Sequence, residues 1–279
     1  MSKIIKEWAS FAKETALLAG DVLKKGFGSS FIIGSKPGKK NLVTQYDRAS
    51  ENLIITEIKS RYPTHSIIAE ESGSFIQQES QVTWIIDPLD GTVNFAHEIP
   101  IFSISIAVAV NKEIVCGVVY QPMTRELFVA QKKQGAFLND RLLNISFVSQ
   151  MNQAFLATGF PYDVHKDPLH CIESFSELLR TGAPIRRLGS AAIDLAYVAA
   201  GRFDGFWEVG LNSWDMAAGM LLVKEAGGMV THYDGTEHQI FGYHNLLATN
   251  KYLHPIMIDY LSKGKHETNG WRIHCKNNS

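Results

Sequence analysis

The chain has 279 residues, of which 45% are hydrophobic, and a formal net charge of −1. This length and apolar content predict one large globular unit, or two closely packed ones, with an ample core. The near-zero charge argues against nonspecific nucleic-acid binding, which needs a basic surface. The longest apolar run, residues 101–110, is too short to span a bilayer.

The first segment, residues 4–25, has the periodicity of an amphipathic helix rather than the pattern of a signal peptide. One stripe of its residues recurs at helical spacing: Ile4, Trp8, Phe11, Thr15, Leu18 and Val22. This stripe predicts packing against a core. A loop rich in glycine, lysine and serine follows at 26–41, and a second helix is predicted at about 48–61.

Strands dominate the next part of the chain. A short strand is predicted at Ile67, and an apolar run at 82–86 predicts a buried strand that ends at Asp87. A hairpin is predicted to join 102–109 to 114–120. Two further short strands continue this sheet at 127–130 and 136–138.

The pattern changes near Met151, where short strands begin to alternate with helices, which is typical of an α/β layer. Strands are predicted at 154–158, at 203–208 and around Met229. Helices are predicted at 169–180, 191–200, 215–226 and 252–261. The sequence therefore predicts an N-terminal half at 1–150, a C-terminal half at 151–262 and a polar tail at 263–279.

Three cysteines bear on the cellular compartment. Cys116, Cys171 and Cys275 lack the spacing of metal ligands, and an odd number of thiols cannot pair completely. Disulfides persist mainly in oxidising compartments, so we expect a cytoplasmic protein.

The end of the strand at 82–86 carries the strongest functional signal. Asp87 and Asp90 lie three residues apart just after it, and Gly91 and Thr92 come next. Clustered carboxylate oxygens suit Mg²⁺, which often completes its shell with substrate phosphate, and free N–H groups at a helix start bind anions. The pattern indicates a metal site beside a phosphate site, although such a turn also occurs for purely local reasons.

Two further acidic clusters favour the functional interpretation. The run that begins at Ile67 ends in Glu70 and Glu71, and Asp215 opens a helix that stops at a double glycine. An acid in the first helical turn is often only a cap. Since no Ser-His-Asp, Cys-His or P-loop pattern is apparent, the three clusters predict hydrolysis by direct attack of metal-activated water.

Five segments together resemble the inositol monophosphatase family. The main one, 84–95, contains the D-P-[IL]-D-G-T-x-N-F motif of that family. The others are 67–73 for G-E-E-S, 213–219 for W-D-x-A-A-G, 42–47 followed by Glu51, and 189–192. Their order and spacing fit to about residue 260, with Ala69 in place of the usual glycine, and the tail after 262 does not align.

The resemblance implies a fold and a setting. The fold is a layered α-β-α-β-α sandwich, of α+β or α/β class, shared by inositol monophosphatases and fructose-1,6-bisphosphatases, with the site between the two halves. The expected cofactor is Mg²⁺, two to three ions. The expected protein is a lithium-sensitive cytoplasmic homodimer that acts on a small phosphorylated polyol or sugar and binds neither nucleic acid nor membrane.

The resemblance also implies residue roles. The expected metal ligands are Glu70, Asp87 and the Leu89 carbonyl for a first ion, and Asp87, Asp90 and Asp215 for a second. Thr92, hydrogen-bonded to Asp47, is expected to orient the attacking water. Glu71 is expected to order metal-bound water, although a solvated acid at a strand end would look the same.

Substrate-binding roles follow from the same resemblance. Gly91 and Thr92 are expected to offer backbone N–H groups to phosphate. The residues expected near the inositol are Asn94, Ala191 and Glu208. A carboxylate at Glu208 suits a polyol, whose hydroxyls donate to it, although an ordinary solvated acid is an equal alternative. Lys36 matches a loop lysine near a third metal.

The function implied is a Mg²⁺-dependent phosphomonoesterase that hydrolyses inositol 1-phosphate to inositol and phosphate. The same site would also suit a fructose-1,6-bisphosphatase or a 3′,5′-bisphosphate nucleotidase. An alternative of another class is a regulatory protein that binds the transcription machinery, because some bacterial relatives do so.

Overall fold

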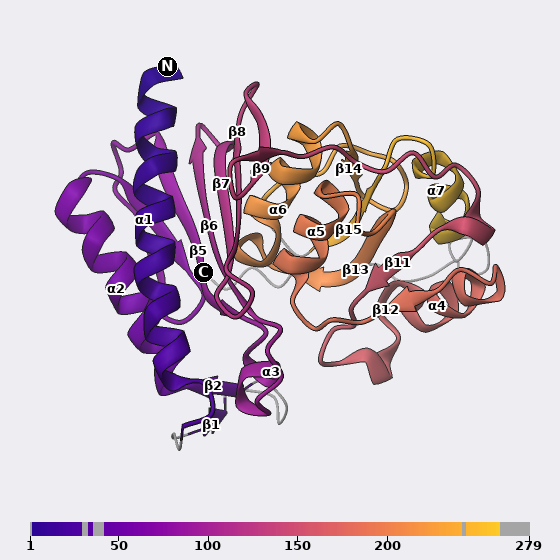
Figure 1. Ribbon diagram of the computed structural model, residues 1–279, viewed down its shortest axis with the longest axis horizontal. Coiled ribbons are helices and arrows are strands. Elements are labelled where there is room, and N and C mark those ends of the chain that lie inside the picture. The colour runs from indigo at the N-terminus through magenta and orange to yellow at the C-terminus, as the bar shows by residue number, and fades with distance from the viewer. Residues whose placement is uncertain (1, 30–32, 36–41, 242–243, 263–279) are drawn as a thin grey trace, which may run out of the picture.

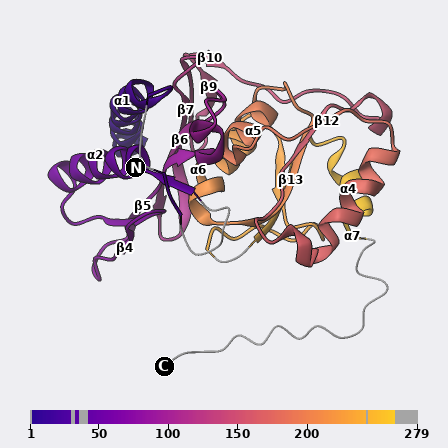
Figure 2. The same ribbon diagram turned by 90° about the horizontal axis from the view of Figure 1, so that it is seen from below.

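The computed structural model describes residues 2–29, 33–35, 42–241 and 244–262, and its helices and sheets stack in five layers (Figure 1). The helices form three of them: α1 (Ser2–Gly26) with α2 (Gln45–Arg61), α5 (Ala191–Ala199) with α6 (Ser213–Glu225), and α4 (Cys171–Arg180) with α7 (His254–Ser262). Two sheets lie between these layers, and the view from below in Figure 2 shows the same order. The predicted α-β-α-β-α sandwich is confirmed.

The first sheet has eight strands. In order across the sheet they are β10 (Arg141–Leu142), β9 (Gly135–Leu138), β8 (Glu126–Gln131), β7 (Glu113–Gln121), β6 (Ser103–Val110), β5 (Val82–Asp90), β3 (Ser66–Ala69) and β4 (Gly73–Phe75). The predicted hairpin is confirmed as β6 and β7. Strands β3 and β5 run parallel, with Ala69 opposite Ile86. Parallel strands end at the same edge of a sheet, so the acids at the ends of these two strands are brought together.

The second sheet has five strands and mixed directions. In order they are β12 (Ile185–Arg186), β11 (Leu156–Thr158), β13 (Gly205–Leu211), β15 (His244–Thr249) and β14 (Met229–Thr231). Strand β15 was not predicted. It pairs antiparallel with strands on both sides, so its position depends on its neighbours rather than on local propensity. A small ladder joins β1 (Ile33–Ser35), which lies within the segment predicted as a loop, to β2 (Leu42–Thr44), which directly follows that segment.

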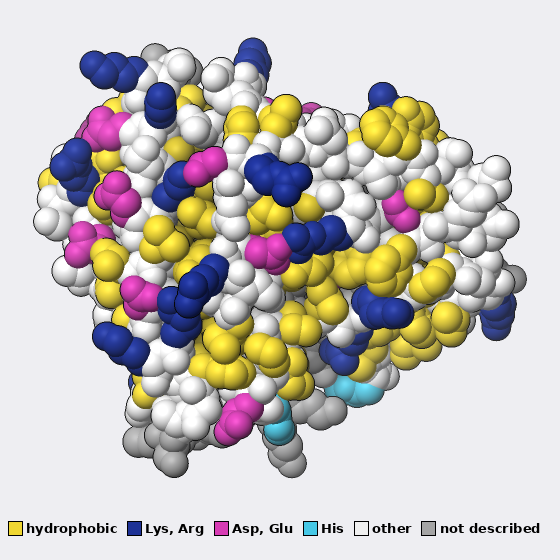
Figure 3. Space-filling view, viewed as in Figure 1, with side chains coloured by type: hydrophobic (Ala, Val, Ile, Leu, Met, Phe, Trp, Pro, Cys, Tyr) yellow, Lys and Arg dark blue, Asp and Glu magenta, His cyan; other side chains and the backbone are white. Residues whose placement is uncertain are grey.

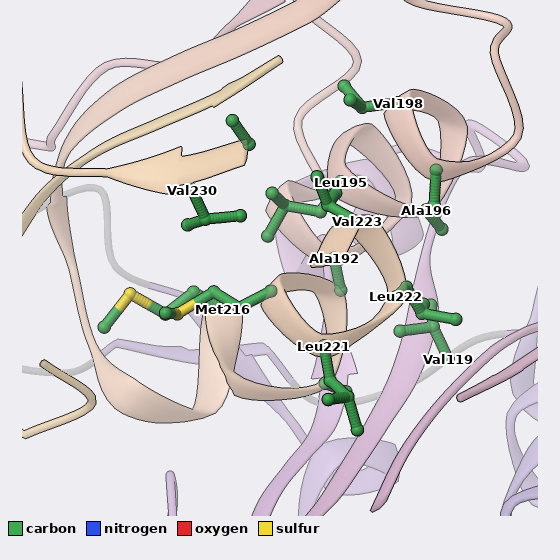
Figure 4. Close-up of a cluster of buried hydrophobic side chains, with 14 of the residues drawn as sticks. Val119, Ala192, Leu195, Ala196, Val198, Met216, Leu221, Leu222, Val223 and Val230 are labelled. Carbon is green, nitrogen blue, oxygen red and sulfur yellow. The ribbon is translucent and has the colours of Figure 1, made fainter. Parts of the chain in front are cut away.

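Helices α5 and α6 fill the space between the sheets. Most of their residues are buried, because a helix with a sheet on each side has little solvent-facing surface. In Figure 4, Leu222 of α6 lies beside Val119 of β7, and Met216 lies beside Val230 of β14. This core joins side chains from both predicted halves, and the division near residue 150 stays a prediction.

Helix α1 buries part of the predicted stripe, including Trp8 and Thr15, but not all of it. Ile4 and Leu18 are 37% and 50% exposed, so the predicted stripe is wrong at both positions. Trp8 is buried as predicted, together with a row of small residues that includes Gly20. A Cβ at Gly20 would overlap the ring of Tyr120. Small residues let the helix lie close to the sheet, and this close packing decides which face is buried.

Two helix starts also differ from prediction. Helix α2 begins at Gln45 rather than near 48, because Thr44 and Asp47 form a reciprocal capping box at its start. Helix α4 begins at Cys171 rather than at 169, after two short 3₁₀ turns at Val164–Lys166 and Pro168–His170. The second turn contains residues 169 and 170, which the sequence pattern assigned to the helix.

The surface carries charges of both signs. On the face shown in Figure 3, basic and acidic side chains are interspersed over the helical layer of α1 and α2, which matches the near-zero net charge. None of the helices in the described part has the length and apolar character needed to cross a membrane. Lys36 and the tail at 263–279 lie outside the described residues.

Candidate active site

Strand β5 continues to Asp90, beyond the predicted end at Asp87. Its pairing with β6 shifts register between these two aspartates, an irregularity that re-aims side chains. Asp87 is 1% exposed, and one of its carboxylate oxygens accepts a hydrogen bond from the Leu89 N–H at 3.0 Å. Gly91 then adopts a φ of 99°, which residues with a side chain rarely adopt, and helix α3 (Thr92–Ala96) begins. The turn places both aspartates a few residues before the start of α3.

Thr92 and Asp47 are joined directly. The Thr92 hydroxyl lies 2.9 Å from Asp47 Oδ1 and 3.1 Å from the Leu89 carbonyl oxygen, and either can accept its hydrogen. The other Asp47 oxygen accepts from the N–H and the hydroxyl of Thr44, at 2.8 and 2.5 Å. Burial raises the pKa of Asp47, while the bonds from Thr44 and Thr92 lower it. The predicted Thr92–Asp47 hydrogen bond is therefore present.

Asp90 is held by the start of helix α5. Its Oδ2 accepts from the Ser190 hydroxyl at 2.6 Å and from the Ala192 N–H at 2.8 Å. Burial raises the pKa of Asp90 to about 6, against the lowering effect of these two bonds. The anionic side chain thus lies where a helix N-terminus is positive, and it links the first sheet to the central helices.

Asp215 lies in the first turn of helix α6, as predicted. Its Oδ2 accepts from the Asn212 N–H at 2.6 Å in a capping box. The turn is tied to the first sheet, because the Ser105 hydroxyl donates to the Trp214 carbonyl at 3.1 Å. Burial raises the pKa of Asp215 well above its usual value, and the charges of Glu70 and Asp90 raise it further.

Glu70 and Glu71 follow the end of β3. The Glu70 N–H donates to the Ile86 carbonyl at 3.3 Å, which continues the pairing with β5. The Glu71 N–H donates to Glu51 on helix α2 at 2.8 Å, and Glu51 is 2% exposed. A buried acid from α2 therefore fixes the backbone from which both glutamates project.

The acids at these strand and helix ends act on one another electrostatically. Burial raises the pKa of Asp87 well above its usual value. The charges of Glu70, Asp90 and Asp215 raise it further. The charges that act most strongly on Asp90 and Asp215 are also those of carboxylates. Like charges held together in a buried place require a compensating cation or protons. The donor set of carboxylate oxygens fits Mg²⁺ in this respect.

The carboxylates do not point at a common centre. Among the described residues, no three histidine, cysteine, aspartate or glutamate side chains are arranged as a ready ligand set. The hydrogen bonds above give the reason, because Asp87, Asp90 and Asp215 each turn an oxygen toward a nearby N–H or O–H group. Each of these bonds engages one carboxylate oxygen, and the other oxygen of each side chain could still bind a metal.

The residues predicted near the substrate differ in their contacts within the protein. The Asn94 amide donates to the carbonyls of Ile101 and Leu188, at 2.7 and 2.8 Å, which leaves its side-chain oxygen as an acceptor. Ala191 is the first residue of α5 and is 7% exposed. Burial raises the pKa of Glu208 to about 8, and the charge of Asp90 adds to this shift. Ala191 and Glu208 therefore lie on the Asp90 side of the acidic cluster.

Four residues near the site had no predicted role. Ser190 donates to Asp90, and Ser50 donates to the Pro88 carbonyl at 2.9 Å. Glu51 accepts from the Glu71 N–H. Asp194 is buried in α5, close enough to Asp90 and Glu208 for their charges to raise its pKa. Helical spacing from Asp47 gives a signal for Ser50 and Glu51. For Asp194 the sequence signal is that it is the single acid in the otherwise apolar stretch at 191–200.

Comparisons with known proteins agree with the fold and the motifs. The model of the inositol monophosphatase family matches residues 5–266. Nus factor SuhB of Salmonella typhimurium is 44% identical over 242 residues, which cover 86% of this chain and 90% of that protein. Inositol-1-monophosphatase of a Synechocystis species is 42% identical over 250 residues, covering 90% and 87%.

A solved structure shows the same architecture. The extragenic suppressor protein suhB from Bartonella henselae superposes with a TM-score of 0.86 at 40% sequence identity, over 91% of this chain and 98% of that one. The family match extends over nearly the whole described chain and includes all the acidic clusters. This chain belongs to the inositol monophosphatase family.

Proposed function

We propose that the protein is a Mg²⁺-dependent phosphomonoesterase that hydrolyses inositol 1-phosphate to inositol and phosphate. The observation that carries the proposal is the group of carboxylates at the ends of β3 and β5 and at the start of α6, whose charges act on one another beside the Thr92–Asp47 hydrogen bond. Membership of the family supports phosphatase activity, and the relative named inositol-1-monophosphatase supports the substrate.

In the proposed mechanism the acids hold the metal. Glu70, Asp87, the Leu89 carbonyl, Asp90 and Asp215 would bind two to three Mg²⁺ ions. When bound, the ions supply charge neutralisation for the phosphate and lower the pKa of water. Glu71, whose N–H is anchored by Glu51, would order water beside them.

Thr92 would orient the attacking water. A hydroxyl has one hydrogen, and the Thr92 hydrogen can be given to Asp47, so its oxygen lone pairs stay available to accept from a water. The N–H groups of Gly91 and Thr92 lie at the start of α3 and would donate to phosphate oxygens. These contacts would fix the water and the phosphorus relative to each other, which is a large part of catalysis by positioning.

Glu208, Asn94 and Ala191 would contact the polyol. A carboxylate that accepts from neighbouring hydroxyls suits inositol better than it suits adenine. A fructose 1,6-bisphosphate or a nucleotide 3′,5′-bisphosphate remains the alternative substrate for the same site, and relative kcat/KM values separate the three.

The test is phosphate release by pure protein from the three substrates, with and without Mg²⁺. We expect Mg²⁺-dependent release with the highest kcat/KM on inositol 1-phosphate, and a loss of several orders of magnitude in kcat for Asp87→Asn and Asp215→Asn. Asp140→Asn is the matched control, since the Asp140 side chain is 90% exposed in a surface ion pair with Lys13. Negligible release from every phosphate ester would refute the proposal.

The same proposal includes a cytoplasmic, lithium-inhibited homodimer. Cys116 and Cys171 are free thiols, which fits a reducing compartment. Sedimentation analysis of the pure protein measures its oligomeric state, and the activity assay with added LiCl measures inhibition. A monomer at micromolar concentration, or unchanged activity in LiCl, would contradict these parts of the proposal.

A second candidate role is regulation through binding to the transcription machinery. The observation that favours it is the similarity to proteins named Nus factor SuhB. An Asp87→Asn variant tests this role separately from catalysis, in a pull-down with purified RNA polymerase and its elongation factors. A partner retained by the inactive variant would support a second role, whereas no retention by either form would count against it.

A further inference from the structure

The described part of the protein does not hold the Glu208 carboxylate by hydrogen bonds, although this acid lies near the site. In the part of the chain that the structure describes, no hydrogen bond or ion pair reaches its oxygens, in contrast to Asp90 and Asp215. The residue is only partly exposed, on strand β13. Two acceptor oxygens that lack donors inside the protein are available to a ligand.

The position of this carboxylate is set by a steric contact instead. A Cβ atom built on Gly159 would overlap Oε1, Oε2 and Cδ of Glu208. The backbone of Gly159 does not lie in the left-handed region, so glycine is needed here for space and not for conformation. The carboxylate of Glu208 thus rests on the bare α-carbon of Gly159.

The two strands that carry this pair are locked in register. Gly159 directly follows β11, which runs parallel to β13 with Thr158 opposite Trp207. The Thr158 hydroxyl donates to the Trp207 carbonyl at 2.7 Å, and Trp207 is 2% exposed. Because the backbone is fixed on both sides, an added methyl group at 159 would move the free end of Glu208 rather than the strands.

We propose that Gly159 is a specificity-determining residue. Because it has no side chain, the Glu208 carboxylate has room to lie against the hydroxyls of a polyol monophosphate. This inference rests on the proposed function, in which Glu208 accepts from those hydroxyls. Gly159 acts through Glu208 and has no contact with the reacting phosphate, so it selects substrates and does not take part in the chemistry.

The test compares inositol 1-phosphate with phenyl phosphate, which has no hydroxyl for Glu208 to accept from. For Gly159→Ala we expect the ratio of kcat/KM on the two substrates to fall about tenfold, the usual size of a lost hydrogen bond to a charged group. The matched control is the same change in a Glu208→Ala background, where the ratio should change less than about twofold, because residues that act through one contact are not additive.

Each outcome decides the proposal. An unchanged ratio in a folded Gly159→Ala variant, or an equal loss with and without Glu208, overturns it. If Gly159→Ala alone does not fold, folding of the Gly159→Ala/Glu208→Ala double variant supports the overlap, and failure of the double variant overturns it. If the wild-type protein hydrolyses neither ester, the proposed function fails. A crystal structure of Gly159→Ala then decides this inference, since an unmoved Glu208 carboxylate contradicts it.

Discussion

Thr92 and Asp47 lie forty-five residues apart in the sequence and are joined by a hydrogen bond of 2.9 Å from the threonine hydroxyl to the aspartate. Asp47 is 0% exposed, and its second oxygen is occupied by the Thr44 cap of helix α2. The start of one helix therefore fixes the side chain at the start of another. The lone pairs of the Thr92 oxygen are directed by an acid that is itself held in place.

This geometry predicts that Thr92→Val lowers kcat by about a hundredfold or more, the lower end of the range for losing a positioned proton-transfer group. Valine keeps the shape of threonine but lacks the hydroxyl. Thr92→Ser is the matched control and should keep most of the activity, since it keeps the donor to Asp47. Steady-state phosphate release measures both variants, and equal activity of the valine and serine forms would mean that the hydroxyl has no role.

The pKa of Asp90, raised to about 6, predicts a pH-dependent requirement for Mg²⁺. A metal ion binds the deprotonated carboxylate and competes with protons. As the pH falls through about 6, protons occupy Asp90 and the Mg²⁺ concentration for half-maximal activity should rise. Activity titrations with Mg²⁺ at pH 5.5 and at pH 8 test this. A constant half-maximal concentration would contradict it.

Ser190→Ala provides the control for that prediction. The Ser190 hydroxyl donates to Asp90 at 2.6 Å and lowers its pKa. Without this bond the pKa of Asp90 should rise, so the increase in required Mg²⁺ should begin at a higher pH than in the wild type. A shift toward lower pH would show that a different group competes with the metal.

The sequence predicts the parts of the site that are encoded locally. The acids at the ends of β3 and β5 and at the start of α6 are recognisable because each follows an apolar run or opens a helix. The sandwich follows from the change of pattern near Met151 and from the family resemblance. Such features depend on residues that are neighbours in the chain.

The missed features depend on contacts between distant residues. The bond from Ser190 to Asp90 spans one hundred positions, and strand β15 exists because strands β13 and β14 pair with it on either side. The buried face of α1 includes a row of small residues, packed closely against the sheet, that the predicted stripe leaves out. No local periodicity carries this information, so the three-dimensional structure is needed to find it.

We predict that the buried Asp194 destabilises the folded protein increasingly as the pH rises. It is 1% exposed, its Oδ1 has no hydrogen-bond partner among the described residues, and burial raises its pKa well above the usual value. A raised pKa in an acid means that the folded state binds more protons than the unfolded state. The free energy of unfolding therefore falls as the pH rises above the unfolded value of about 3.9.

Urea unfolding of the wild type and of Asp194→Asn, in EDTA at pH 5 and pH 8, measures this contribution. Asparagine has a similar shape and does not titrate. We expect the stability of the wild type relative to the variant to decrease between the two pH values, by no more than about 1.4 kcal/mol per pH unit. A difference between the two proteins that does not change with pH would rule out a titrating Asp194.

For His254 we predict the opposite pH dependence, in which the folded protein loses stability as the pH falls. It is 1% exposed, with Nε2 at 2.9 Å from the Thr231 hydroxyl and Nδ1 at 2.7 Å from the Thr249 hydroxyl. The Thr231 hydroxyl donates to the His232 carbonyl at 2.7 Å, so it accepts from Nε2–H. Nδ1 then accepts from Thr249, and the ring is neutral. Protonation would add a second donor at Nδ1, facing a hydroxyl that already donates to it.

Burial lowers the pKa of His254 to about 4, against about 6.5 in the unfolded chain. Between these values the unfolded state binds more protons, so the free energy of unfolding should fall as the pH drops from 6.5 to 4, by about 3 kcal/mol in total from this residue. His254→Gln keeps a donor and an acceptor without titrating in this range. Chemical unfolding at several pH values should therefore show a smaller acid-induced loss in the glutamine variant, and an identical loss in both proteins would place the acid sensitivity elsewhere.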